Sequence, residues 1–215
     1  MRWRYLLFDL DGTLTDPMLG ITRSVQYALR RFGIEIDDLR TLCRFIGPPL
    51  KESFRDFYGM DDEQAARAVA LTREYFAPRG IFENRLYEGI PELLTELQAA
   101  GCMLAMATSK PEPFARQIAE HFRLADRFAL IGGATMDGTR TAKRDVVRHV
   151  LDALGMEDPT AAVMIGDRRY DIEGAAAEGI ASIGVLWGYG SREELAAAGA
   201  GQIAGTIPEL RALLL

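Results

Sequence analysis

The first clear pattern along the chain is a short apolar run that ends in an acid. Residues 6–8 read Leu-Leu-Phe, Asp9 follows them, and Asp11 stands two residues further on. An uninterrupted apolar run is typical of a strand that is buried on both faces of a parallel sheet, whereas a carboxylate favours the point where the chain reaches the surface. The pattern predicts a strand over residues 3–8 that delivers two acids to its carboxyl end, where Gly12 allows a sharp turn.

Two different patterns follow this strand. Over residues 16–86 the apolar positions recur at helical spacing, and we expect helices without a strand. From residue 87 onwards, short apolar runs alternate with helical stretches. We expect helices at residues 21–32, from Leu50, and at 61–77, 91–101, 111–122, 141–154, 169–178, 192–198 and 208–214. We expect strands at residues 103–107, 128–131, 161–165 and 181–185, and near 202–203. Gly132-Gly133 and Asp137-Gly138 read as turns.

Alternation of strands and helices of this length is typical of crossover units in a parallel sheet. The sequence therefore predicts an α/β protein with a Rossmann-like parallel-sheet core. We expect residues 1–15 and 87–215 to form this core, and residues 16–86 to form an inserted, all-helical cap domain.

Composition narrows the class of protein. The 215 residues are 48% hydrophobic and 26% charged, and the net charge is −6 with the acids spread along the chain. No basic patch indicates a nucleic-acid polymer as partner, and no apolar stretch is long enough to span a membrane. Asp9 and Asp11 interrupt the apolar run after Arg2 and Arg4, so we do not interpret the start as a secretion signal.

Cysteine usage agrees with that picture. Cys43 and Cys102 are too few for a disulfide framework and lack the spacing of a metal site, so we interpret both as buried apolar groups. We expect a cytoplasmic protein, and the sequence leaves its oligomeric state open.

Polar residues gather where the predicted strands end. Asp9 and Asp11 follow the first strand, Thr108 and Ser109 a second, and Asp167 a third. Each alone is explained by a turn or a helix cap, and Ser109-Lys110-Pro111-Glu112 reads as a capping box. The carboxyl ends of parallel strands meet at one edge of the sheet, where open α/β proteins bind ligands. Together with Lys143, which opens the next helix, these groups favour phosphoryl transfer through an aspartyl intermediate.

The chemistry of such a transfer assigns a task to each residue type. A carboxylate that attacks phosphorus divides one difficult step into two. Because the phosphate dianion repels the carboxylate, a cation must stand between them, and the hard oxygens of Asp9 and Asp167 favour Mg²⁺. Asp11 can protonate the leaving oxygen and later activate water.

Three further groups complete this predicted site. Thr108 and the backbone N–H of Ser109 can hold the transferring oxygens. Lys143 would offset the charge on Asp9 and on the phosphate. Asp171 lies one helical turn beyond Asp167, on the same face, where it can orient metal-bound waters or pair with Lys143.

These residues resemble the four motifs of the haloacid dehalogenase-like hydrolase superfamily. The first reads Asp9-Leu10-Asp11-Gly12-Thr13-Leu14, the second and third are Thr108 and Lys143, and the fourth reads Gly166-Asp167-Arg168-Arg169-Tyr170-Asp171. The resemblance implies that Asp9 is the nucleophile and Asp11 the general acid/base. It also implies Mg²⁺ held by Asp9, the Asp11 backbone carbonyl and Asp167, and a phosphate site that includes Gly12, Thr108, Ser109 and Lys143.

The third motif departs from the family pattern. Much of the family reads Gly-Lys-Pro there, whereas this chain reads Ala142-Lys143-Arg144. Arg140 and Arg144 are therefore rival cations for the role given to Lys143.

The position of the helical insert resembles the subfamily that contains phosphoglycolate phosphatases. Residues 44–51 resemble the substrate loop of those enzymes, so Arg44 or Lys51 is expected to contact the substrate, or else to be a solvated surface charge. This resemblance implies a phosphatase for small phosphate monoesters, enclosed when a lid closes.

Other functions remain open at this point. Residues 133–140 and the loop at Trp187 resemble bacterial 5′-nucleotidases, which makes a nucleoside 5′-monophosphatase the close rival. For the loop 187–190 itself we favour packing over a place at the pocket. A sugar-phosphate mutase would keep both Asp9 and Asp11, and a non-catalytic binding module would be expected to have lost an aspartate or the lysine.

Overall fold

The computed structural model describes residues 2–215, and the chain divides into two compact units. The first unit comprises the chain up to Asp16 together with Leu86–Leu215, and the second comprises Pro17–Arg85. The sequence pattern places the corresponding boundaries after residue 15 and before residue 87. Among the described residues, no helix has both the length and the apolar character needed to cross a membrane.

A parallel six-stranded sheet forms the centre of the first unit, in the order β5-β4-β1-β6-β7-β8. Its strands are β1 (Tyr5–Phe8), β4 (Met103–Pro111), β5 (Leu130–Ala134), β6 (Ala162–Gly166), β7 (Ala181–Val185) and β8 (Gln202–Ala204). Phe8 of β1 lies opposite Met106 of β4 on one side and opposite Ile165 of β6 on the other. The central strands are covered on both faces, which explains their continuous apolar runs. The predicted α/β class with a Rossmann-like sheet is confirmed.

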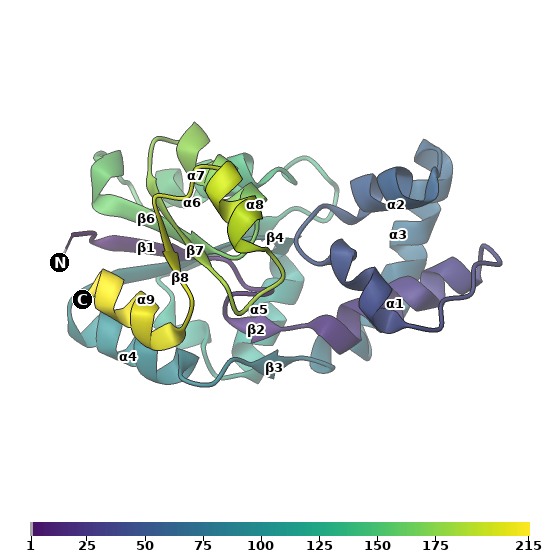
Figure 1. The fold of residues 1–215 in the computed structure, drawn as a ribbon, viewed down its shortest axis with the longest axis horizontal. Helices are drawn as coiled ribbons and strands as arrows, with labels where there is room; N and C mark the ends of the chain where they lie inside the picture. The colour runs from purple at the N-terminus through teal and green to yellow at the C-terminus, as the bar shows by residue number, and fades with distance from the viewer. Residues whose placement is uncertain (1) are drawn as a thin grey trace. The chain divides into compact units, whose positions relative to one another are not determined.

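Helices cover both faces of this sheet. They are α4 (Ile90–Ala99), α5 (Glu112–His121), α6 (Lys143–Ala153), α7 (Arg169–Ala177), α8 (Arg192–Ala197) and α9 (Ile207–Leu214), with short 3₁₀ turns η3 (Ala125–Arg127) and η4 (Pro159–Ala161). Figure 1 shows α6 and α7 on one side of the sheet and α4 and α9 on the other. The core beneath α6 joins Leu7 and Met164 of the sheet to Val147 and Val150 of the helix.

The topology determines where a site can form. After β1 the chain adds β4 and β5 on one side, and it later returns to add β6, β7 and β8 on the other side. Open α/β sheets bind ligands at the carboxyl ends of the strands where the direction of winding reverses. In this chain that point lies between β1 and β6.

The second unit is helical. It contains α1 (Met18–Arg30), α2 (Leu50–Tyr58) and α3 (Asp62–Phe76), with 3₁₀ segments η1 (Leu39–Phe45) and η2 (Gly80–Phe82). Helix α1 packs against α3 and η1, and α2 packs against α3. The ring of Phe45 lies 5.0 Å from that of Phe54 and 5.3 Å from that of Phe57, so η1 and α2 share an aromatic core.

Two short strands were not predicted. Strands β2 (Thr15–Asp16) and β3 (Arg85–Leu86) pair with each other, although the pattern predicted no strand over residues 16–86. Each contains only two residues, which is too short for a period of two to be visible in the sequence.

The pair Gly132-Gly133 was wrongly predicted as a turn, because both residues belong to β5. The structure shows why glycine is needed in this strand. A Cβ on Gly132 would lie 2.3 Å from Cγ2 of Val150, and one on Gly133 would lie 2.6 Å from the backbone oxygen of Lys110. The glycines therefore allow α6 and β4 to approach β5 closely, in agreement with the use of glycine inside strands.

The predicted capping box at Ser109 is also wrong. Strand β4 continues to Pro111, with a shift in register against β5 between Thr108 and Pro111. Helix α5 then begins at Glu112 without a side-chain cap. Ser109 and Lys110 are consequently part of the strand that reaches the predicted site.

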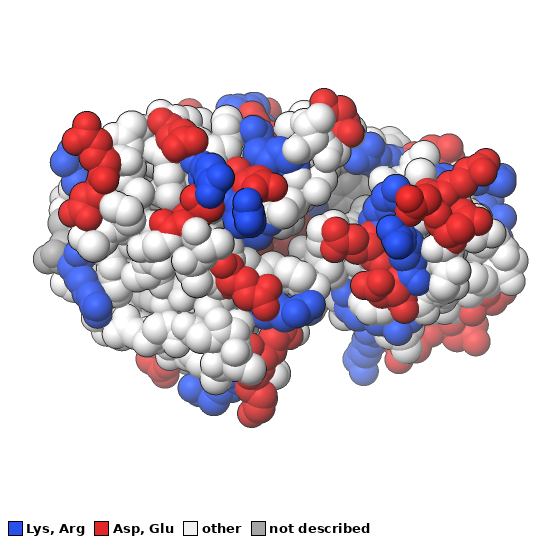
Figure 2. All heavy atoms as spheres, turned by 90° about the horizontal axis from the view of Figure 1, so that it is seen from above, with Lys and Arg blue, Asp and Glu red and all other residues white. Residues whose placement is uncertain are grey.

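Charged side chains are interspersed on the surface. Figure 2 shows acidic and basic residues mixed across the displayed face, without one large region of a single sign. This distribution agrees with the modest net charge of −6.

Candidate active site

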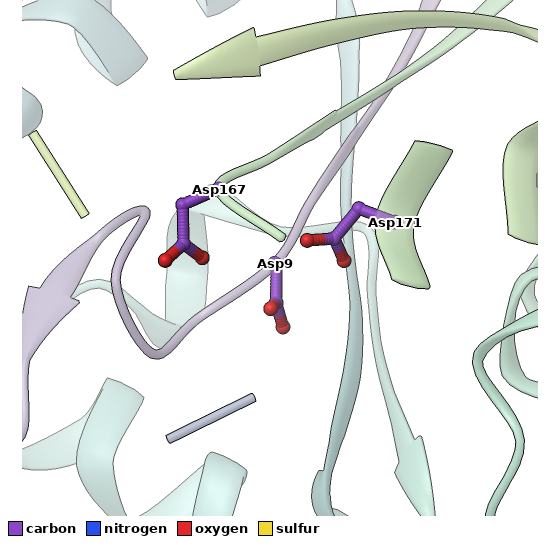
Figure 3. Close-up of side chains that lie close together, drawn as sticks. All are labelled: Asp9, Asp167 and Asp171. Atoms are coloured by element: carbon purple, nitrogen blue, oxygen red, sulfur yellow. The ribbon is translucent and has the colours of Figure 1, made fainter. Parts of the chain in front are cut away.

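Asp9 and Asp167 follow directly after the adjacent strands β1 and β6. The backbone N–H of Asp9 donates to the carbonyl oxygen of Ile165 at 2.9 Å, which continues the pairing of the strands up to the two acids. Asp9 is 4% exposed and Asp167 is fully buried. Oxygen atoms of Asp9, Asp167 and Asp171 lie within 4.8 Å of one another, and Figure 3 shows their carboxylates converging from β1, β6 and α7.

Lys143 lies among these acids. From the first turn of α6, its Nζ lies 3.0 Å from Oδ1 of Asp9 and 2.7 Å from Oδ1 of Asp171. It also donates to the backbone oxygen of Ala107 at 3.0 Å. Burial by itself would lower the pKa of Lys143, but Asp171 and Asp9 outweigh it and raise this pKa to about 12. Lys143 is therefore a permanent cation in this site.

Burial disfavours the charged forms of the Asp167 and Asp171 carboxyl groups. Burial, and then the charges of Asp171 and Asp9, hold the pKa of Asp167 well above its usual value. Burial raises the pKa of Asp171 to about 6, although Lys143 acts in the opposite direction. Buried anions that repel one another favour either protonation or a bound cation.

The charges of the buried groups indicate which cation fits. The site contains four carboxylates and two ammonium groups, and it therefore has two excess negative charges when all six are ionised: Asp9, Asp11, Asp167 and Asp171 against Lys110 and Lys143. One divalent ion would balance this excess. The ligand atoms of the three clustered acids are all carboxylate oxygens, which suit a hard ion such as Mg²⁺ or Ca²⁺.

Asp11 has a cation of its own, which the sequence analysis missed. Nζ of Lys110 lies 2.7 Å from Oδ2 of Asp11, and the two side chains are 6% and 11% exposed. Burial raises the pKa of Asp11, while Lys110 acts to lower it. The sequence signal was present, because Lys110 follows Thr108 by two residues in the same strand, but the predicted capping box assigned this lysine to a helix start.

The loop after β7 lies against the acids, whereas the sequence analysis favoured packing over a place at the pocket. The backbone N–H of Tyr189 donates to Oδ2 of Asp167 at 2.7 Å, and Nε1 of Trp187 donates to the carbonyl oxygen of Thr13 at 3.0 Å. The Tyr189 hydroxyl is hydrogen-bonded to the carboxylate of Asp16. This loop therefore connects the fourth motif to the segment that follows the first.

Close approach at the site explains two of the motif glycines. Gly12 has a φ of +82°, and a Cβ on this residue would lie 2.2 Å from Oδ2 of Asp167. A Cβ on Gly166 would lie 2.1 Å from Cγ of Asp171. Gly12 is thus required both by its backbone conformation and by the proximity of a carboxylate; a phosphate contact at Gly12 stays a prediction.

The second motif lies at the same edge. Thr108 is buried in β4, and its hydroxyl accepts a hydrogen bond from the backbone N–H of Lys110 at 3.2 Å. Ser109 is half-buried in the same strand. Their contacts with a phosphate stay predictions.

The rival arginines point to other partners. Arg140 pairs with Glu112 at 3.3 Å and donates to the backbone oxygen of Gly133 at 3.0 Å. Arg144 pairs with its neighbour Asp145 at 3.2 Å in an exposed position. The cation beside Asp9 is Lys143, and the departure from the family pattern at this motif does not displace it.

Arg44 and Lys51 have partners within the helical unit. The guanidinium of Arg44 lies 4.4 Å from the centre of the Phe57 ring, in cation–π range. Nζ of Lys51 lies 3.6 Å from an oxygen of Asp62, with both side chains largely exposed. Such surface pairs contribute little to stability, and a substrate contact by either residue stays a prediction.

Comparison with known proteins places this chain in a family. The family model described as haloacid dehalogenase-like hydrolase matches residues 6–185. A protein named 5′-nucleotidase from Pseudomonas aeruginosa is 51% identical over 92% of this chain and 89% of its own length. A protein named tyrosine-protein kinase PtkA from Mycobacterium tuberculosis is 41% identical over 97% of this chain and 72% of its own length.

A more distant relative and a solved structure support the same family. A protein named phosphoglycolate phosphatase from Aquifex aeolicus is 29% identical, over 86% of each chain. The crystal structure of a predicted phosphatase from Clostridium acetobutylicum superimposes with a TM-score of 0.97 at 47% identity, and the match covers 100% of this chain and 99% of the other. The chain belongs to the haloacid dehalogenase-like hydrolase family.

Proposed function

We propose that this protein is a Mg²⁺-dependent phosphatase that hydrolyses small phosphate monoesters in two steps, with Asp9 as the nucleophile. The observation that carries the proposal is the convergence of Asp9, Asp167 and Asp171 around Lys143 at the edge where β1 and β6 end. Oδ1 of Asp9 accepts a hydrogen bond from the backbone N–H of Leu10 at 2.8 Å and lies 3.0 Å from Nζ of Lys143. These contacts orient the carboxylate for attack.

The proposed metal ligands are Asp9, Asp167 and the backbone carbonyl of Asp11. Members of this family generally use a divalent metal, and the donor set of this chain fits one. When bound, Mg²⁺ would offset the repulsion between the Asp9 carboxylate and the substrate phosphate. Asp171 orients Lys143 through its 2.7 Å contact and is not proposed as a direct metal ligand.

In the first step Asp9 attacks phosphorus and Asp11 gives a proton to the leaving oxygen. In the second step Asp11, now a carboxylate, takes a proton from the water that attacks phosphorus. The bond between phosphorus and Asp9 breaks, which releases inorganic phosphate and restores the Asp9 carboxylate. Thr108 and the backbone N–H of Ser109 hold the transferring oxygens. The helical unit acts as the cap that excludes water from the reaction.

The direct experiment measures hydrolysis of para-nitrophenyl phosphate by the purified protein with Mg²⁺ and with a chelator. Turnover is expected only with the metal, and Asp9→Asn is expected to lower kcat by at least about 10³-fold, as for other removed nucleophiles. Full activity of Asp9→Asn would remove Asp9 from the role of nucleophile. Absence of turnover by the wild-type protein on every phosphate ester tested would contradict the whole proposal.

Two substrate classes have support. The relative named 5′-nucleotidase, at 51% identity over 92% of the chain, favours a nucleoside 5′-monophosphate. The segment 44–51 and the relatives named phosphoglycolate phosphatase, one of them at 29% identity, favour a small phosphorylated acid. We expect a small phosphorylated metabolite in the cytoplasm. Comparison of kcat/KM over nucleoside monophosphates, phosphoglycolate and sugar phosphates decides between the classes.

Metal binding is expected to be linked to proton release. In the metal-free folded protein the pKa values of Asp167 and Asp171 are raised, the latter to about 6. At pH values between the ordinary carboxyl pKa and these raised values, the folded state therefore binds more protons than the unfolded state. The metal-free protein is thus most stable, as far as these two groups are concerned, at low pH, and it loses this stability as pH rises through the folded pKa values. Mg²⁺ competes with those protons, so its stabilising effect should grow with pH, by up to about 1.4 kcal/mol per pH unit for each proton displaced.

Thermal unfolding with saturating Mg²⁺ and with chelator, at about pH 5 and about pH 8, measures this linkage. The increase in Tm caused by Mg²⁺ is expected to be larger at the higher pH, and Asp167→Asn should lose most of the increase. An equal increase at both pH values would mean that these carboxylates do not exchange protons for the metal.

A further inference from the structure

A second buried ion pair lies beside the nucleophile, and the four family motifs do not include its cation. Lys110 reaches Asp11 from β4, with 2.7 Å between Nζ and Oδ2, and its side chain is 6% exposed. Charged groups this deeply buried are rare unless each has a specific partner. The pair is separate from the group around Lys143, which contacts Asp9 and Asp171.

The two oxygens of Asp11 are in different environments. Oδ2 faces the ammonium of Lys110, whereas Oδ1 is buried and has no hydrogen-bond partner within residues 2–215. An unpaired buried oxygen is costly, and at a functional site it points to a partner supplied by the substrate. The contact at Oδ2 fixes the rotation of the carboxyl group, and with it the position of Oδ1.

Lys110 is itself held by the strand. Its backbone N–H donates to the hydroxyl of Thr108 at 3.2 Å, at the point where the register of β4 against β5 shifts between Thr108 and Pro111. The segment that carries the second motif thus also carries the lysine that contacts Asp11. The backbone of Lys110 is thus fixed in the strand and its ammonium is fixed by Asp11, an arrangement that pre-organises the lysine for its task.

We propose that Lys110 is a positioning residue for the leaving-group chemistry, acting through Asp11. This inference rests on the proposed function. As the bond between Asp9 and phosphorus forms, the bond from phosphorus to the leaving oxygen breaks, its electron pair remains on that oxygen, and the proton on Oδ1 of Asp11 passes to it to give the alcohol. Lys110 holds Oδ2, so that Oδ1 faces the leaving oxygen when the proton moves.

The proposal predicts a dependence on the leaving group that a general structural role would not produce. A good leaving group such as para-nitrophenolate departs without a proton, whereas phenolates with electron-donating substituents, and alkoxides, need one. Misplacing the acid should therefore slow esters of poor leaving groups selectively. A misplacement of about one ångström is enough to cost about 10²-fold in rate.

The experiment measures kcat/KM of the full-length, Mg²⁺-loaded protein for a series of para-substituted phenyl phosphates, which share one shape and differ in leaving-group pKa. Lys110→Met is compared with Asp11→Asn, with the double variant and with Arg140→Met. Arg140 is a matched control, because it is a partly buried arginine at the same edge of the sheet whose partner is Glu112. Circular dichroism and Tm confirm folding of each variant.

Lys110→Met is expected to lose less than about tenfold on para-nitrophenyl phosphate and about 10²-fold on the poorest leaving group. Its plot of log kcat/KM against leaving-group pKa should steepen toward that of Asp11→Asn. Arg140→Met should keep the wild-type slope. In the Asp11→Asn background, Lys110→Met should cost less than about twofold more, because Lys110 acts through Asp11.

Other results would overturn the inference. An equal loss on every ester, or a large further loss in the double variant, would show that Lys110 acts independently of Asp11. If Lys110→Met alone fails to fold, the comparison of the double variant with Asp11→Asn still decides the question. Failure of the proposed function would look different, because the wild-type protein would then be inactive or Asp9→Asn would remain active.

Discussion

Replacement of Lys143 by methionine is expected to lower the free energy of unfolding of the metal-free protein by about 3–5 kcal/mol. The reason is that Asp9 and Asp171, which are 5% and 1% exposed in their side chains, would both lose the cation between them. Removing one partner of a buried ion pair leaves an uncompensated charge, which costs far more than the pair contributes. The same change should lower kcat/KM by about 10²–10³-fold, because Asp9 and the phosphate lose a preorganised cation.

Denaturant unfolding in chelator and steady-state kinetics in Mg²⁺ measure the two effects. Arg148→Met is the matched control on the same helix, since Arg148 pairs with Glu178 at 2.9 Å with half of its side chain exposed. Water screens this pair through the half-exposed arginine, although the Glu178 side chain is only 10% exposed, so removal of Arg148 is expected to cost less than removal of Lys143. If Lys143→Met were as mild as Arg148→Met, the buried charge balance described for the site would be incorrect.

Replacement of Gly188 by alanine is expected to lower both stability and activity, although Gly188 lies in a loop outside the four sequence motifs. A Cβ on Gly188 would lie 2.4 Å from Oδ2 of Asp167 and 2.4 Å from the backbone oxygen of Gly12. Either the loop or Asp167 must move to relieve the contact. We expect a destabilisation of about 1–3 kcal/mol from overpacking, and a loss of about 10²-fold in kcat/KM as Asp167 is displaced.

Titration with Mg²⁺, followed by Tm and by activity, measures this effect, and the apparent metal affinity should fall. Gly205→Ala is the control, because a Cβ there would meet only the end of the exposed Glu209 side chain, at 3.2 Å. Wild-type metal affinity in Gly188→Ala would indicate that the loop can move away without disturbing Asp167.

Much of the site followed from one type of sequence signal. An apolar run that ends abruptly in an acid indicates both a strand and its carboxyl end. Asp9 and Asp167 were predicted as site residues from this signal. Asp171 followed from its spacing of one helical turn beyond Asp167. Lys143 was chosen for its place at the start of a helix between two such strands and for its match to the third family motif, with Arg140 and Arg144 as rivals. In each case the chemistry coincides with the boundary of a regular element.

The remaining features depend on contacts between segments that are distant in sequence. In the sequence Lys110 looked like part of a helix start. The extension of β4 to Pro111 depends on pairing with β5, which a local pattern does not show. Gly132 and Gly133 belong to a strand because they pair with β4, and the close approach of Val150 to Gly132 and of Lys110 to Gly133 explains the glycines; no local pattern reveals either. Tyr189 contacts Asp167 through its backbone N–H, and such a contact leaves no signature in side-chain type.

The central claim is that Asp9 itself accepts the phosphoryl group. Quenching the enzyme with borohydride during turnover reduces an aspartyl phosphate to homoserine, and mass spectrometry of the peptide that contains residue 9 detects the change. We predict homoserine at residue 9 only when both substrate and Mg²⁺ are present. Continued turnover with an unmodified residue 9, or with the modification at another residue, would contradict the account.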